Sequence, residues 1–419
     1  MPRFGKKISA EERLSVFYSL TLNLLGLVLI GLGLVILWSY IQAPAPVHSD
    51  FNNDYRAAQA LRSGRSIYAA TNAHPPCDAL LFVPLSYLSS RVAFVLWSLF
   101  SILCYFGTIF FILSELPVNI PSRWRLPVLG LTLCWYPLLA HIALGQWSLI
   151  LGAFLVLGWG ALRRDEERLA GILFGLATAI KLFPALVGIL LLLRRKWCAL
   201  AWMVSLVIIT LLLSVQLVGM TDVFRYFLIL SPENVARYAT FPVNVSLTGL
   251  ISRFFVAGRW VRPWLVSPRL AKVIIFSSSL LLLADWGWQT WYLPPGRHGD
   301  DLAFAYVLLL MLLLSPITWQ HVFPLLLLPL GILIRAGQRA SQWRYWWLML
   351  LIFILLSIPD VQLAQYLAMK FSPHGISPLA NLIFAAPTVA LLLLWYLLHR
   401  LSVELMSNSG YARWMANSE

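Results

Sequence analysis

Two carboxylates lie four residues apart near the start of the chain, in the sequence HSDFNNDY that contains Asp50 and Asp54. A carboxylate can act as a general base and take a proton from a hydroxyl group. Asp50 also precedes the stretch AAQAL, so it or Ser49 could instead cap a short helix by accepting backbone hydrogen bonds. Capping is the commoner role for such a residue, and both interpretations stay open at this point.

Two basic side chains interrupt apolar sequence farther along the chain. Lys181 lies in ATAIKLFPAL, three residues before Pro184, and His321 lies in SPITWQHVFP, where Pro316 ends one helix. A lone lysine among apolar residues either extends its amine to the membrane surface or binds an anion. A helix that opens at Pro184 would present its amides to the same anion. His321 could have a function in the site, but a lone histidine in such a position is more often an anchor at the membrane interface.

Three further polar residues lie in turns or loops between apolar segments: Arg56, Gln146 in LGQW and Asn244 in PVNVSL. They could bind a ligand or, for Gln146 and Asn244, satisfy the backbone of a turn. The sequence has no phosphate-binding glycine loop, nucleophile elbow or His/Cys metal cluster, and its four cysteines lack metal-ligand spacing. We therefore expect neither a cofactor nor a metal.

The composition excludes a water-soluble protein. Hydrophobic residues make up 60% of the 419 residues and charged residues only 11%, whereas a soluble domain carries about 25% charged residues. Apolar runs recur from residue 16 to residue 402, which also excludes a soluble protein with one anchor. The Lys and Arg residues behind the net charge of +14 cluster in short loops, a pattern that sets membrane topology and differs from a nucleic-acid site.

The apolar runs and basic loops predict about eleven membrane crossings. Basic residues place 163–168 and 335–344 in the cytoplasm, which leaves 42–75 and 315–321 outside. The segment 248–270 is ambiguous because arginines and a proline interrupt it. Ten of the crossings are expected as helices at 16–41, 92–113, 126–144, 147–162, 197–218, 272–292, 302–314, 322–334, 345–358 and 381–401.

The remaining crossing, residues 169–193, differs from the others because basic residues flank both of its ends. We predict two short half-helices that enter and leave on one side, with Lys181 near the turn between them. Broken helices are tolerated where they are buried in protein or line a cavity. A single spanning helix is the alternative interpretation.

We thus predict an all-α polytopic membrane protein with a single domain over residues 1–419. The first outer loop, 42–75, would contain a short helix at 57–61, the stretch 75–88 would lie at the interface, and 403–419 would form a cytoplasmic tail. This topology gathers five polar candidates at one outer face: Asp50, Asp54, Gln146, Asn244 and His321. Lys181 would face them.

Six sequence elements resemble glycosyltransferase family 87, and they occur in the family's order over about residues 45–335. They are DFNNDYRAAQALRSGRSIY, HPPCDALLFVPLSYL, LGQWSLILGAF, LAGILFGLATAIKLFPALVGILLLLRRKW, VNVSLTGLISR and SPITWQHVFPLLLLP. Each element alone is a weak signal, but the ordered set is specific. Two positions depart from the family pattern: Asp54 stands where an aromatic residue is usual, and His74 replaces a tyrosine.

The resemblance implies a GT-C membrane fold and the transfer of a sugar, often mannose, from a polyprenyl-phosphate donor. The acceptor would be a hydroxyl of a glycolipid or glycan at the outer face of a bacterial inner (plasma) membrane, the periplasmic or extracellular side. Asp50 would be the catalytic base and His321 a catalytic residue beside the leaving phosphate. The expected donor- or acceptor-binding residues are Asp54, Arg56, Gln146, Lys181 and Asn244.

A transporter or flippase of lipid-linked sugars is the alternative function. Transporters also contain broken helices and polar residues at membrane depth. The two halves of this chain, however, show no repeat symmetry. A flippase would need a polar path that reaches both faces, whereas the polar candidates here stop at one face. The sequence therefore favours the enzyme.

Overall fold

The computed structural model describes residues 10–43, 50–69, 74–340, 342–371 and 375–407. Across these ranges the chain is helical, apart from loops and one parallel bridge between Val261 and Ile376. Seven described helical segments are long and apolar enough to cross a membrane. An eighth results if two helices bent by 53°, α17 (Trp343–Leu356) and α18 (Asp360–Phe371), count as one span. The predicted all-α polytopic fold is confirmed, but the count of about eleven crossings is not.

The seven spans begin and end close to the predicted boundaries. Two of them combine consecutive helices, α5 (Ser122–Leu133) with α6 (Tyr136–Leu144), and η4 (Gln320–Leu326) with α16 (Leu327–Ala340). The others are α1 (Ala10–Gln42), α4 (Ser90–Glu115), α10 (Trp197–Val218), α14 (Pro268–Tyr292) and α19 (Asn381–Met406).

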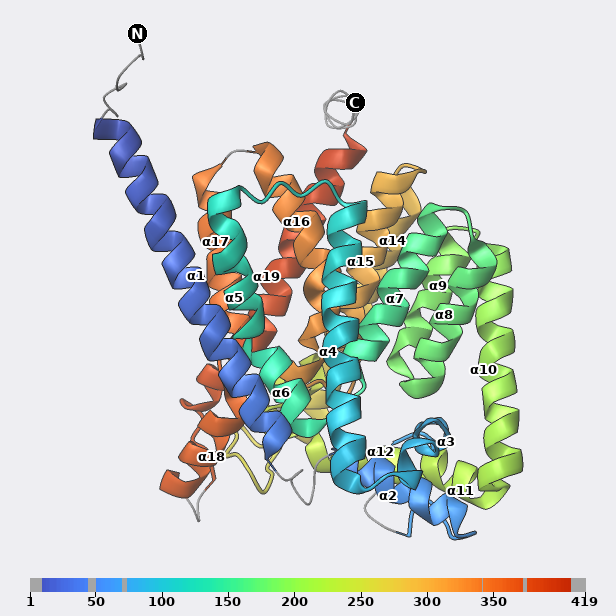
Figure 1. The fold of residues 1–419 in the computed structure, drawn as a ribbon. Coiled ribbons are helices and arrows are strands. Elements are labelled where there is room, and N and C mark those ends of the chain that lie inside the picture. The colour runs from blue at the N-terminus through green and yellow to red at the C-terminus, as the bar shows by residue number, and fades with distance from the viewer. Residues whose placement is uncertain (1–9, 44–49, 70–73, 341, 372–374, 408–419) are drawn as a thin grey trace.

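Helix α1 lies on the outside of the bundle, against α5 (Figure 1). Glycines permit the close approach of the two backbones. A Cβ atom on Gly26 would lie 2.6 Å from Leu126, and one on Gly130 would lie 2.5 Å from Leu29. Small residues allow such contacts between helices in lipid, where van der Waals packing drives association.

The segment after α7 (Ser148–Arg163) forms the predicted broken pair. Helix α8 (Glu167–Ile180) ends before Lys181, whose φ of −135° and ψ of 139° are extended. A 3-10 turn, η2 (Phe183–Ala185), then leads into α9 (Leu186–Leu193). The sequence therefore located the break correctly.

The two ends of this broken pair meet at one end of the bundle. The Lys196 ammonium lies 3.5 Å from carboxylate oxygens of both Asp165 and Glu167. The backbone amide of Ala199 also donates to Glu167. In Figure 1, α8 and α9 both lie in the half of the bundle where α1 begins. The segment enters and leaves on the same side, so it is a re-entrant pair.

More charged contacts close the same end. Helix α15 (Arg297–Leu314) is buried along almost its whole length, and its first turns carry the acidic partners. Arg163 lies 2.6 Å from Asp301, and Arg194 donates to Asp300 at 2.7 Å. The Gln338 side chain donates to the carbonyl of Asn119 at 2.6 Å. The basic residues at the ends of α7 and α9 thus pair with the start of α15 at this end of the bundle.

Short helices gather at the opposite end (Figure 1). The predicted outer-loop helix is α2 (Asp50–Arg62), which starts earlier than expected, and 75–88 forms α3 (Pro76–Phe82) and η1 (Leu85–Tyr87). Three consecutive elements after α10 were not predicted: α11 (Met220–Arg225), the π-helix η3 (Tyr226–Leu230) and α12 (Ser231–Tyr238). Residues 44–49, 70–73 and 408–419 of the predicted loop and tail lie outside the described residues.

The ambiguous segment 248–270 does not form a spanning helix. Only α13 (Leu247–Phe255) is helical there before α14 starts. The buried Arg253 guanidinium donates to the carbonyls of Asn244 and, at 3.1 Å, Phe384. These bonds fix α13 against α19, and burial lowers the Arg253 pKa to about 9.

The re-entrant pair predicts which engineered cysteines react from the same face. In a background without the four native cysteines, Glu166→Cys and Arg195→Cys should react with a membrane-impermeant maleimide from one face of sealed vesicles. Ser63→Cys, next to the exposed end of α2, should react only from the other face. Labelling of Glu166→Cys and Arg195→Cys from opposite faces would contradict the re-entrant geometry. The native cysteines to be replaced are Cys77, Cys104, Cys134 and Cys198.

Candidate active site

Helix α2 is attached to the bundle by its apolar face, which fixes where its two carboxylates lie. The Phe51 ring packs 5.6 Å from that of Phe82 and 5.1 Å from that of Phe94. The Tyr55 hydroxyl donates to the Leu88 carbonyl at 2.7 Å. Asp50, the first residue of α2, keeps 22% of its side chain exposed.

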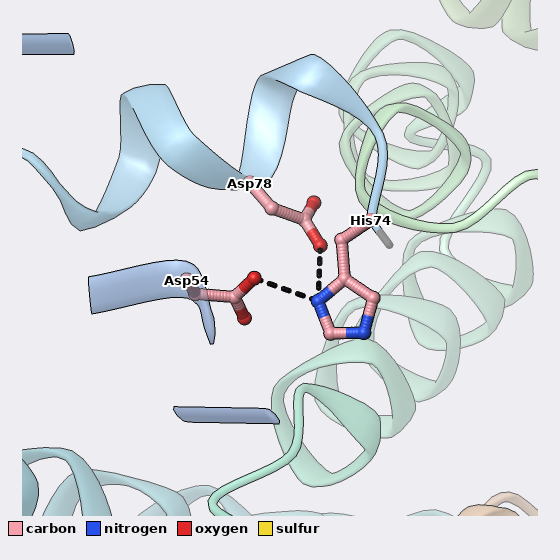
Figure 2. A group of neighbouring side chains, drawn as sticks. All are labelled: Asp54, His74 and Asp78. Atoms are coloured by element: carbon pink, nitrogen blue, oxygen red, sulfur yellow. Dashed lines mark hydrogen bonds and ion pairs between the residues drawn. The ribbon is translucent and has the colours of Figure 1, made fainter. Parts of the chain in front are cut away.

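Asp54, by contrast, is fully buried and contacts His74, which lies just ahead of α3 (Figure 2). Its Oδ1 lies 2.6 Å from His74 Nδ1, and its Oδ2 accepts a hydrogen bond from Trp147 Nε1 at 3.0 Å. Asp78, one turn along α3, points at the same His74 nitrogen, with Oδ2 3.6 Å away. The other ring nitrogen of His74 lies 4.0 Å from Asp50 Oδ1. His74 therefore stands between Asp50 and two buried carboxylates.

The local electrostatics shift the pKa values of these groups. Burial raises the pKa of Asp50, although the nearby positive charges of His74 and Lys181 oppose the rise. Burial also raises the pKa of Asp78 well above its ordinary value. For His74, burial acts to lower the pKa, but the charge and hydrogen bond of Asp54 outweigh it, so the pKa rises. A carboxylate with a raised pKa, as Asp50 has, is a stronger base than an exposed one.

Lys181 and His321 come from distant parts of the sequence to the same region. Lys181 occupies the break between α8 and η2, and its charge acts on Asp50, His74 and Asp78. His321 lies in η4 with 8% of its surface exposed, and it interacts electrostatically with Lys181 and His74. The fold thus brings together the predicted base, the predicted lysine and the predicted histidine.

Asn244 makes a structural connection. Its Nδ2 donates to the carbonyls of Tyr238, at 3.1 Å, and Pro316, at 3.0 Å. Its Oδ1 accepts from Ser246 Oγ at 2.9 Å and from the Thr318 amide at 3.1 Å. This buried side chain ties the turn before α13 to the loop that precedes His321. These contacts agree with the interpretation that the Asn244 side chain satisfies the backbone of a turn.

The other two candidates differ from each other in position. Gln146 is buried in the turn between α6 and α7, beside the Trp147 that donates to Asp54, and its Oε1 has no hydrogen-bond partner among the described residues. Arg56 is exposed on α2 and, within the described residues, adds no contact to the group around His74. The structure does not bring Arg56 together with the other candidates.

The sequence reasoning missed the part played by His74 and Asp78. Both lie in the outer-loop region and are four residues apart, as are Asp50 and Asp54, so two such pairs side by side were the available signal. In space, Asp54, His74 and Asp78 each place one ligand atom within 4.8 Å of the others, an arrangement able to hold a metal ion. Sequence spacing alone does not reveal it because twenty residues separate Asp54 from His74.

Comparison with known proteins establishes the family. Residues 72–316, more than half of the chain, match the profile of glycosyltransferase family 87. The chain belongs to glycosyltransferase family 87. The resemblance in the sequence motifs is thereby confirmed. The matched region contains His74, Lys181 and Asn244, while Asp50 and His321 lie outside its two ends.

A curated relative adds a more specific comparison. The chain is 29% identical over 252 residues to a polyprenol-phosphate-mannose-dependent alpha-(1-2)-phosphatidylinositol pentamannoside mannosyltransferase of Mycolicibacterium smegmatis. The similarity covers 59% of this chain and 57% of the relative, so it spans little more than half of that protein.

Asn244→Ala should destabilise the protein by at least about 2 kcal/mol, because each buried group left unsatisfied costs about 1–3 kcal/mol. Thermal unfolding of the purified protein in detergent would measure the change as a lower Tm. Asn119→Ala is the control, since Asn119 is exposed and contacts Gln338 only through its backbone. Equal Tm values for the two variants would show that the Asn244 bonds do not hold the loop.

Proposed function

We propose that this protein transfers a hexose, with mannose as the first candidate, from a polyprenyl-phosphate donor to a hydroxyl of a glycolipid or glycan acceptor. Family membership and the activity named for the mycobacterial relative support the reaction class and the donor. The observation that carries the proposal is the convergence of Asp50, Lys181 and His321 from three separate segments. A base and two groups able to face a phosphate are what this transfer needs.

Asp50 is the proposed general base. Of the three carboxylates around His74, Asp50 alone keeps an exposed surface, so it alone can reach a substrate hydroxyl. It would take the proton as the acceptor oxygen bonds to the anomeric carbon. The bond from that carbon to the phosphate oxygen breaks, and its electron pair leaves with the polyprenyl phosphate. A single displacement inverts the configuration, so a β-linked donor gives an α-linked product.

Lys181 and His321 are the proposed partners of the leaving phosphate. The break in the re-entrant pair holds the Lys181 ammonium at membrane depth, where a charged group is costly unless it meets an opposite charge. An anionic phosphate there would gain more from a cation than it would in water. His321 would add a hydrogen bond as negative charge develops on the phosphate oxygens.

The other candidates take supporting roles in this proposal. Asp54 holds His74, since both of its oxygens are engaged in buried hydrogen bonds. Gln146 lies beside Trp147 and Asn244 anchors the loop before His321, so both position the site. Arg56, which is exposed at the same end of the bundle, remains a candidate contact for the acceptor.

We place the site at the outer face of a bacterial inner membrane, on the periplasmic or extracellular side. Basic residues favour the cytoplasmic side, and they concentrate in the loops at the opposite end of the bundle. That opposite end is closed by ion pairs such as Arg163 with Asp301. A polar path to both faces, as a flippase requires, therefore has no support in the described residues.

Asp50→Asn should lower turnover by about a hundredfold or more, because an amide cannot accept the hydroxyl proton at useful strength. A helix cap would survive the same change, since Asn and Asp cap equally well. The measurement is release of polyprenyl phosphate from polyprenyl-phosphate mannose by the purified protein with acceptor glycolipid. Asp54→Asn should weaken turnover less, and Glu233→Gln, on the exposed face of α12, should leave it unchanged. Near-normal turnover in Asp50→Asn would place the base elsewhere.

Lys181→Met should raise the KM for the polyprenyl-phosphate donor by about ten- to a hundredfold, the worth of one charged hydrogen bond. Lys272→Met, which removes an exposed lysine from α14, is the matched control and should leave the KM unchanged. The same assay, run at varied donor concentration, gives both constants. An unchanged donor KM in Lys181→Met would remove Lys181 from the donor site.

A further inference from the structure

Asp78 is a fully buried carboxylate without hydrogen bonds. Neither of its oxygens has a hydrogen-bond partner among the described residues, and its side chain has no exposed surface. An ionised carboxylate in such a place costs several kcal/mol unless it is paired. Each buried polar group of this kind requires an explanation, and an ion is one of them.

His74 cannot satisfy Asp78 and Asp54 together. A single hydrogen on Nδ1 can make one good bond, and the 2.6 Å contact gives it to Asp54, leaving Asp78 at 3.6 Å. The second oxygen of Asp54 already accepts from Trp147. Lys181 acts on Asp78 through its charge, but no ion pair between them occurs in the described part of the chain. Asp78 therefore has no cationic donor at hydrogen-bond distance among the described residues.

We propose that Asp54, His74 and Asp78 form a binding site for one divalent transition-metal ion. The ligand atoms would be His74 Nδ1 and one oxygen from each carboxylate, which lie within 4.8 Å of one another. An ion between them would supply a cationic partner for Asp78 and replace the single shared hydrogen. Imidazole suits zinc, and carboxylates suit manganese, so Zn²⁺ and Mn²⁺ fit this mixed set better than Mg²⁺ or Ca²⁺ do.

The surrounding structure prepares the three ligands. The Tyr68 hydroxyl donates to the His74 carbonyl at 2.9 Å, which fixes the backbone ahead of α3. Trp147 orients Asp54, and a ligating carboxylate usually has such an outer hydrogen bond. A ligating histidine usually directs its second nitrogen toward a carboxylate. Asp50 lies on that side of the His74 ring, with its Oδ1 4.0 Å from Nε2, which is beyond hydrogen-bond distance.

The ion would join α2 to α3 at the position from which Asp50 projects. Removing the ion should loosen this junction and return the mutual repulsion of Asp54 and Asp78. The binding site does not depend on the proposed function, whereas its effect on Asp50 as a base does. Metal binding and sugar transfer can therefore be tested separately.

The test is titration of the full-length protein in detergent, purified by a tag without histidines and stripped with a chelator. Mn²⁺ alone is added, and the free ion is followed by its paramagnetic resonance signal; Zn²⁺ is then added as a competitor. We expect one saturable site per chain. His74→Gln and Asp78→Asn should each lower the affinity by at least about tenfold, since even residues behind the ligands change affinity by about 10–100-fold.

Asp285→Asn is the matched control. Asp285 forms a carboxylate–imidazole pair with His399 at 3.1 Å on other helices, outside the proposed site, so this variant should bind Mn²⁺ as the unaltered protein does. Metal should also raise the Tm of the unaltered protein and leave the Tm of Asp78→Asn unchanged. This second measurement tests the site independently of the affinity of the variant. The proposal fails if the unaltered protein has no saturable Mn²⁺ or Zn²⁺ site. It also fails if folded His74→Gln and Asp78→Asn retain full affinity.

Discussion

A backbone amide that leaves a helix inside an apolar layer costs several kcal/mol unless it finds another hydrogen-bond partner. This constraint applies to residues 181–186, which connect α8 to α9. The Lys181 amide still donates to Ala177 at 3.1 Å, and the Ala185 amide donates to Leu182 at 3.0 Å. Pro184 has no amide hydrogen to satisfy. These bonds lower the cost of turning the chain back between α8 and α9. The position of Lys181 relative to Asp50, His74 and His321 depends on this turn.

The sequence predicted the ends of the seven long spans closely because hydropathy is a property of each segment alone. It also predicted the re-entrant pair, because basic residues at both ends of 169–193 are visible without a structure. The helices α11 and α12 were missed because distant contacts hold them. Asp222 of α11, for example, accepts hydrogen bonds from Ser66, at 2.8 Å, and from the Ile67 amide, at 3.1 Å. No pattern within 219–247 contains that information.

The candidate site shows the same division between local and distant information. Asp50, Lys181 and His321 could be chosen from the sequence because each interrupts or follows an apolar run. Asp78 could not, since its importance arises only when α3 packs against α2 and directs it to His74. Residue type also did not separate Asn244, which uses its side chain to connect two turns, from a residue that binds a ligand.

The length of α8 bears on how the membrane potential would affect anion binding at Lys181. The 14 residues of α8 extend about 21 Å. If α8 starts at the edge of an apolar layer about 30 Å thick and runs straight across it, Lys181 lies roughly 9 Å short of the far boundary. An anion drawn from that boundary to Lys181 crosses about a third of the membrane field. The work is about 0.8 kcal/mol per 100 mV, since a full crossing corresponds to about 2.3 kcal/mol. If the Asp50 end lies outside, as we propose, an inside-negative potential opposes this step, and the energised state of the cell then enters the affinity for an anionic lipid.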